Sequence, residues 1–88
     1  MIRVTKKDET TYSVTVEADT ITRHTVTLSP PYHAKLTDGK VSPEVLVEKS
    51  FEFLLEREPN TSILGSFDLP VIGRYFPEYE SEIGKRLG

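Results

Sequence analysis

Residues 42–59 read SPEVLVEKSFEFLLEREP, and this stretch predicts the central helix of the molecule. Ser42 is a good N-cap, Pro43 fits the first helical position and Pro59 stops the helix, so we expect a main helix over residues 43–57. One side carries an acidic side chain at every fourth position, and the opposite side is apolar. The acidic side consists of Glu44, Glu48, Glu52 and Glu56, and the apolar side of Leu46, Val47, Phe51, Phe53, Leu54 and Leu55.

The apolar side of this helix is wide. At about 100° per residue, its apolar positions span roughly 200° of arc. A helix that rests on one small sheet needs a narrower apolar stripe than this. We therefore expect the helix to be buried on two sides, either by the C-terminal segment of the chain or by a second subunit.

The first third of the chain predicts β-strands. Threonine occurs eight times in residues 1–28, and β-branched residues favour the pleated surface of a sheet. Apolar and polar side chains alternate in residues 12–18 and again in residues 23–28, which is typical of strands with one buried face. A shorter strand fits residues 2–5. Together these segments predict an antiparallel β-meander of two or three strands within residues 2–28.

Short helices are expected around the main helix. A short helix or helical turn fits residues 31–36, after the last strand. Residues 69–75 and 77–87 are two further candidates, and the second has acidic residues early and basic residues late, which suits the helix dipole. We thus expect a single α+β domain over residues 1–88. In it, the small antiparallel β-meander is covered by the main helix and by short C-terminal helices.

Composition and charge argue against several classes of protein function. The chain has 88 residues, a net charge of −3 and no cysteine, so it has neither disulfides nor thiolate metal ligands. Its basic residues are outnumbered by acidic ones, which argues against a surface built to coat nucleic acid. The first residues lack the apolar stretch of a signal peptide, and no stretch reaches membrane-spanning length. We expect a cytoplasmic protein that does not enter a membrane.

The sequence offers little for catalysis. His24 and His33 are the only histidines, Ser29 and Ser50 have no evident base nearby, and no residue pair has zinc-ligand spacing. The five glycines are scattered and form no phosphate loop. We expect no enzyme activity, no cofactor, no metal and no small-molecule substrate. His24 falls on the apolar side of its strand, which predicts a partly buried imidazole with satisfied hydrogen bonds.

Apolar and aromatic side chains predict a binding role. Four of the eight aromatic residues, at positions 67, 75, 76 and 79, lie near the C-terminus, where they complete the core or dock a partner. The main hypothesis is a small non-catalytic protein-interaction or self-associating regulatory module, with a protein partner or a homodimer. A weaker hypothesis assigns the glutamate column of the main helix to a basic partner surface. The candidate partner-binding residues are Phe51, Leu54, Leu55, Tyr75, Phe76 and Tyr79.

Residues 22–57 also resemble the ribbon-helix-helix family. The resemblance rests on TVTLSPPY at 25–32, Leu36, Gly39, Ser42 and LVEKSF at 46–51. It implies a dimeric DNA-binding transcriptional regulator or antitoxin, in which a strand pairs across the dimer and lies in the major groove. Arg23, Thr25 and Thr27 would then read bases. This DNA-binding role is the alternative function. It needs a free edge on the strand at residues 23–28, and the strand at residues 12–18 is also expected to pair with that strand.

Overall fold

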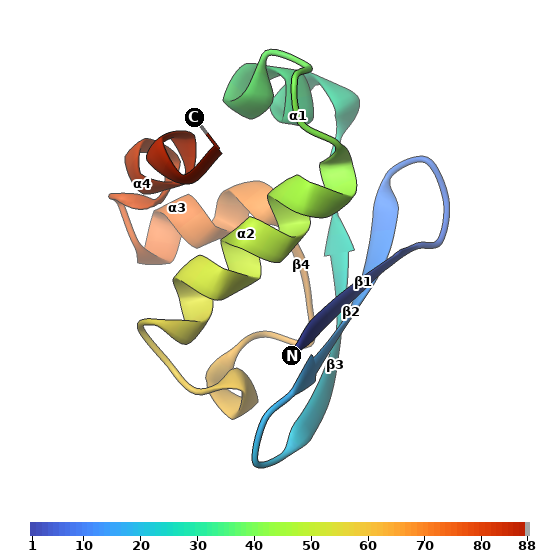
Figure 1. Ribbon diagram of the computed structural model, residues 1–88, viewed down its shortest axis with the longest axis vertical. Coiled ribbons are helices and arrows are strands. Elements are labelled where there is room, and N and C mark those ends of the chain that lie inside the picture. The colour runs from blue at the N-terminus through green and yellow to red at the C-terminus, as the bar shows by residue number, and fades with distance from the viewer. Residues whose placement is uncertain (88) are drawn as a thin grey trace.

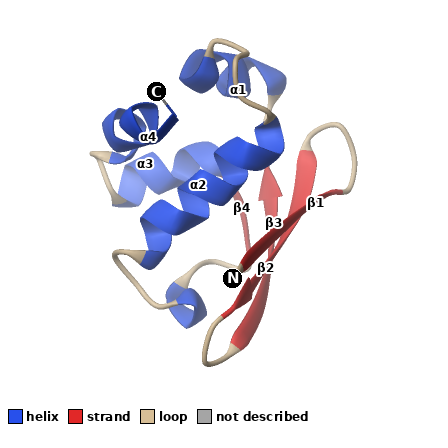
Figure 2. Cartoon of the chain, in the orientation of Figure 1, coloured by secondary structure: helices blue, strands red, loops and turns tan. Residues whose placement is uncertain are grey.

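The central helix is α2, Pro43–Leu55, which lies between a β-sheet and the C-terminal helix α4 (Figure 1). The computed structural model describes residues 1–87, and its helices and strands form the expected α+β fold (Figure 2). The other elements are β1 Ile2–Lys6, β2 Thr11–Glu17, β3 Ile21–Thr27, α1 Pro30–Thr37, the 3-10 turn η1 Asn60–Ser62, β4 Ser66–Asp68, the 3-10 turn η2 Leu69–Val71, α3 Ile72–Tyr75 and α4 Tyr79–Leu87.

The first three strands form the antiparallel meander that the sequence predicts. β1, β2 and β3 are neighbours in chain order, with Val14 opposite Val4 on one side and opposite His24 on the other. Tyr12, Val14 and Val16 are buried, and the residues between them are only partly covered. This alternation places one face of the sheet against α2, in agreement with the period-two pattern.

A fourth strand differs from the expected meander. β4 runs parallel to β3, with Phe67 opposite Val26, so the sheet is mixed. The backbone N–H of Thr25 donates to the carbonyl of Gly65 at 2.8 Å, at the start of this pairing. Three residues are too few to show a period-two pattern in the sequence. The extended conformation of β4 depends on its pairing with β3, which lies far away along the chain.

The helix starts follow the capping signals in the sequence. The Ser42 hydroxyl accepts a hydrogen bond from the N–H of Val45 at 3.2 Å, and Pro43 occupies the first position of α2. Ser29 caps α1 in the same way, accepting from the N–H of Tyr32 at 3.4 Å. α1 is slightly longer than expected, and α2 ends two residues before the expected boundary, where the chain turns towards Pro59.

α2 is buried on two sides, as its wide apolar arc predicts. Its buried residues are Leu46, Val47, Ser50, Phe51, Phe53 and Leu54. The sheet covers one side, and the fully buried Tyr79 and Ile83 of α4 cover the other. The rings of Phe53 and Tyr79 lie 5.3 Å apart in an edge-to-face arrangement. Of the two alternatives expected from the sequence, it is the C-terminal segment of the same chain that buries the second side of α2.

Candidate partner-binding groove

The structure separates the six candidate partner-binding residues into two groups. Phe51 and Tyr79 have no exposed surface and are part of the core, and Leu55 packs against the core. Tyr75 and Phe76 instead converge, together with the core residue Leu54, on one depression of the surface. The residue types alone could not distinguish these groups, because both consist of apolar and aromatic side chains.

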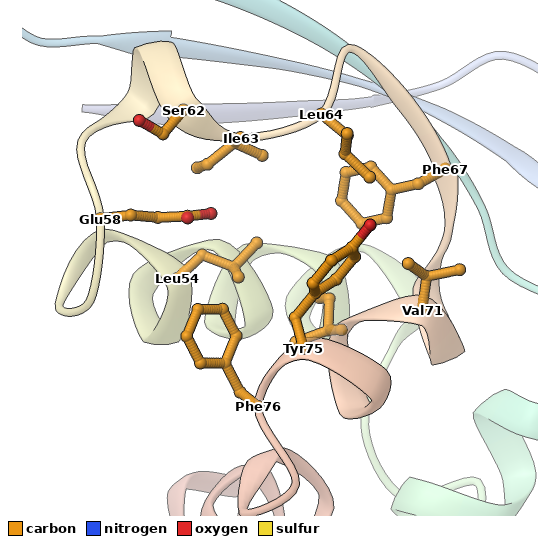
Figure 3. A pocket seen from close by; sticks show the side chains of 10 residues that line it. Leu54, Glu58, Ser62, Ile63, Leu64, Phe67, Val71, Tyr75 and Phe76 are labelled. Atoms are coloured by element: carbon orange, nitrogen blue, oxygen red, sulfur yellow. The ribbon is translucent and has the colours of Figure 1, made fainter.

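This depression, which we call the α2–α3 groove, has a volume of about 370 Å³ and lies between the C-terminal end of α2, the segment after it, β4 and α3 (Figure 3). Two large apolar side chains stand exposed at its mouth: Leu64 exposes 46% of its surface and Tyr75 66%. Leu64 belongs to the apolar run of residues 62–67, which has neither the period of a helix nor that of a strand and therefore gives no signal in the sequence. The residues lining the groove are Leu54, Glu58, Ser62, Ile63, Leu64, Phe67, Val71, Ile72, Tyr75 and Phe76.

Hydrogen bonds from two buried side chains fix the wall of the groove that residues 60–64 form. His24 is 3% exposed, and its Nδ1 lies 2.8 Å from the carbonyl oxygen of Leu64. Asn60 is also buried, and its Nδ2 donates to the carbonyl of Thr20 at 2.7 Å and to Oγ1 of Thr22 at 3.0 Å. These contacts attach the segment after α2 to the start of β3. The wall is therefore held by the hydrogen bonds of two buried polar side chains.

The contacts of His24 assign its tautomer. A carbonyl oxygen can only accept, so Nδ1 of His24 carries the hydrogen and donates to Leu64. Nε2 then accepts from the Thr22 hydroxyl, 2.9 Å away. The ring also lies 5.3 Å from that of Phe51. The expectation of a partly buried imidazole with satisfied hydrogen bonds is confirmed.

Glu58 is the one charged residue among the ten that line the groove. It is partly buried, and Figure 3 shows its side chain extending into the groove between Ile63 and Leu54. Within residues 1–87, its carboxylate takes part in no ion pair. The groove is thus an apolar hollow with a single unpaired negative charge.

The strand proposed for DNA reading, β3, has neighbouring strands on both sides. Arg23, Thr25 and Thr27 lie on the side of β3 that faces away from α2, and Arg23 is exposed. β3 pairs with β2 along its whole length, and its other edge pairs with β4 over Thr25–Thr27. A ribbon-helix-helix dimer would need an edge of β3 for the partner's strand, and over Thr25–Thr27 both edges are already paired.

Two other features, metal-binding clusters and membrane-spanning helices, are absent from the part of the chain that the structure describes. Within residues 1–87, no group of three His, Asp or Glu side chains could hold a metal ion, and no helix has the length and apolar character needed to cross a bilayer. Ser50 is fully buried, with its hydroxyl bonded to the carbonyl of Leu46 and to Tyr79. It therefore acts as a structural hydrogen-bonding group.

Fold and groove together define a small α+β domain, in which a mixed four-stranded sheet and three short helices pack around one central helix and leave an apolar groove at its C-terminal end. No protein-family model, curated protein or solved structure matches the chain. The case for a function therefore rests on the geometry and charge of the groove itself.

Proposed function

We propose that this chain is a non-catalytic protein-interaction module that binds a segment of another protein in the α2–α3 groove. The observation that carries the proposal is the pair of exposed apolar side chains, Leu64 and Tyr75, at the mouth of an apolar hollow of about 370 Å³. Apolar side chains that gather around a concave surface are typical of binding sites, whereas isolated ones are ordinary. Burial of this surface would provide the apolar centre of an interface.

The rigid wall of the groove supports the same function. The hydrogen bonds of His24 and Asn60 hold residues 60–64 in place without a ligand. A preformed groove loses less conformational entropy on binding than a loop that must first become ordered. The opposite wall is formed by α3 and carries Tyr75, a ring that combines apolar area with a polar hydroxyl.

Site-specific photo-cross-linking in the source cells tests this function. A benzoylphenylalanine placed at Tyr75 should cross-link one defined protein. The same group at Val45, which is 39% exposed at the start of α2 and lies outside the groove, should not. Leu64→Glu, which adds a charge at the mouth of the groove, should abolish the cross-link from position 75. Equal products from both positions, or none from position 75, would contradict the proposal, and a cross-link to a second copy would indicate self-association instead.

A further inference from the structure

We propose that the segment bound in the α2–α3 groove carries a basic side chain beside its apolar anchor, and that Glu58 receives this basic group. The inference rests on the proposed docking function and adds the chemistry of the partner. Glu58 follows the C-terminal end of α2, and its backbone N–H donates to the carbonyl of Leu54 at 2.9 Å. This contact holds its backbone while the side chain reaches into the groove (Figure 3).

Glu58 differs from Glu56 and Glu78, because Arg57 and Arg86 pair with those two carboxylates and not with Glu58. Arg86 lies 2.6 Å from Glu56, and Arg57 lies 3.0 Å from Glu78. The Arg57 guanidinium also sits 3.6 Å from the centre of the Phe53 ring and donates to the carbonyl of Phe53. Arg57 is therefore held towards α4, and the chain leaves the carboxylate of Glu58 available to a cation from outside.

The surroundings of Glu58 strengthen its preference for a cation. When an apolar occupant covers a carboxylate, the carboxylate loses its bound water. This costs free energy unless a cation or a hydrogen-bond donor replaces the water. The C-terminal end of α2 adds partial negative charge at the same place. A neutral or acidic segment would bury this charge without a partner, so the groove selects by excluding such segments as well as by attracting basic ones.

The rest of the groove specifies the position of the basic side chain. Leu64, Phe67 and Tyr75 offer apolar and aromatic surface at the opposite side of the groove from Glu58 (Figure 3). A bulky apolar side chain fits there, while a lysine or arginine close to it in the partner reaches Glu58. An arginine can pair with the carboxylate through two hydrogen bonds. The expected occupant is thus a short peptide segment with a large apolar residue next to Arg or Lys.

Selection from a phage-displayed library of random peptides of about twelve residues tests this inference. The wild-type chain should select peptides in which Arg or Lys lies next to Leu, Phe or another bulky apolar residue. Glu58→Lys should select acidic residues at the basic position. Glu58→Gln should weaken the best wild-type peptide about tenfold, as expected for the loss of one charge-assisted hydrogen bond. Glu48→Gln, which changes a partly buried glutamate outside the groove, should leave its affinity unchanged.

The same selection separates failure of this inference from failure of the docking function. Peptides that depend on Leu64 but show no basic enrichment, and bind Glu58→Gln as well as wild type, would overturn the role of Glu58 and leave the groove as a docking site. An empty selection, or peptides that bind Leu64→Glu as tightly as wild type, would overturn the docking function itself.

Discussion

Ser50 and Tyr79 form a buried hydrogen bond between α2 and α4. The Ser50 hydroxyl donates to the carbonyl of Leu46 at 2.8 Å, so the Tyr79 hydroxyl must donate to Oγ of Ser50, 2.6 Å away. Burial raises the pKa of Tyr79, which keeps the phenol protonated and able to donate. The two residues are therefore not equivalent: the Tyr79 hydroxyl needs Ser50 as its acceptor, whereas the Ser50 hydroxyl has the carbonyl of Leu46 as its own acceptor.

This asymmetry predicts different costs for two conservative substitutions. Tyr79→Phe removes one donor and leaves Ser50 bonded to Leu46, so it should lower the free energy of unfolding by about 1 kcal/mol. Ser50→Ala leaves the buried Tyr79 hydroxyl without its acceptor, and should cost about 2–3 kcal/mol. Urea unfolding of both variants measures the difference, and a larger loss for Tyr79→Phe would contradict the assigned donor directions.

His24 provides a second prediction at this scale. His24→Phe keeps an aromatic ring near Phe51 but removes both ring nitrogens, so the Leu64 carbonyl and the Thr22 hydroxyl lose a partner. We expect a loss of stability of about 1–3 kcal/mol, together with faster amide hydrogen exchange in residues 60–65. Thr15→Val, on the solvent-facing side of β2, is the control and should change neither. Unaltered exchange in His24→Phe would show that the imidazole does not hold the wall of the groove.

Ion pairs fasten the last helix to the end of α2. Arg86 bonds to Glu56 at 2.6 Å, and Arg57 bonds to Glu78 at 3.0 Å, just before α4 begins. The hydrogen bond from Arg86 lowers the pKa of Glu56. The pKa of Glu78 is lowered first by the hydrogen bond from its own backbone N–H and then by Arg57. Both carboxylates are thus stabilised in their charged form when the chain is folded.

These pKa directions predict weaker folding in acid. Because the pKa values fall on folding, the pairs contribute stability above the unfolded pKa and lose it as the pH falls through the folded pKa. Lowering the pH from about 5 to about 3 should reduce the free energy of unfolding. Glu56→Gln should make that reduction smaller, whereas Glu48→Gln should not. Urea unfolding at several pH values compares the variants, and equal pH dependence in wild type and Glu56→Gln would contradict a stabilising role for the Glu56 pair.

Local signals explain which elements could be predicted. The N-cap Ser42 with Pro43, and the alternation in residues 12–18, act within a few residues, and α2 and β2 appear where these signals place them. β4 has no such signal, since its conformation comes from a partner strand distant in the sequence. The contact between α2 and α4 is also made by segments distant in the sequence. The sequence alone therefore does not decide whether the C-terminal segment or another subunit buries the second side of α2. Long-range pairing is the part that residue patterns alone do not contain.

The α2–α3 groove shows the same limit of sequence-based prediction at the scale of the whole molecule. The residue types of Leu54, Tyr75 and Phe76 predict a binding surface, and the structure brings the three side chains together. The residue type of Phe51 gives the same prediction, and Phe51 lies in the core. Leu64 has a non-periodic context and gave no signal, although its exposure is central to the groove. Residue type predicts apolar surface, but only the packing of distant segments decides which part of that surface remains uncovered.

The packing of α4 against α2 predicts that the chain is a monomer in solution. Since α4 fills the second side of α2, no wide apolar helix face that would require a second copy is left within residues 1–87. Light scattering over a roughly hundredfold dilution should give the mass of one chain, 10.0 kDa, at every concentration. A mass of two chains that persists on dilution would contradict this expectation and would assign the groove or the sheet edge to self-association.

Two substitutions to glutamate separate the core from the groove in the intact molecule. Phe51 is fully buried, and Phe51→Glu places a charge in the core without a partner, which should cost more than about 4 kcal/mol and leave the small domain largely unfolded. Leu64 is 46% exposed, so Leu64→Glu should change stability by no more than about 0.5 kcal/mol. Circular dichroism during thermal unfolding measures both. A folded Phe51→Glu chain with an unchanged melting temperature would place Phe51 outside the core. An unfolded Leu64→Glu chain would show that Leu64 supports the fold, and the binding surface would then have to be sought elsewhere.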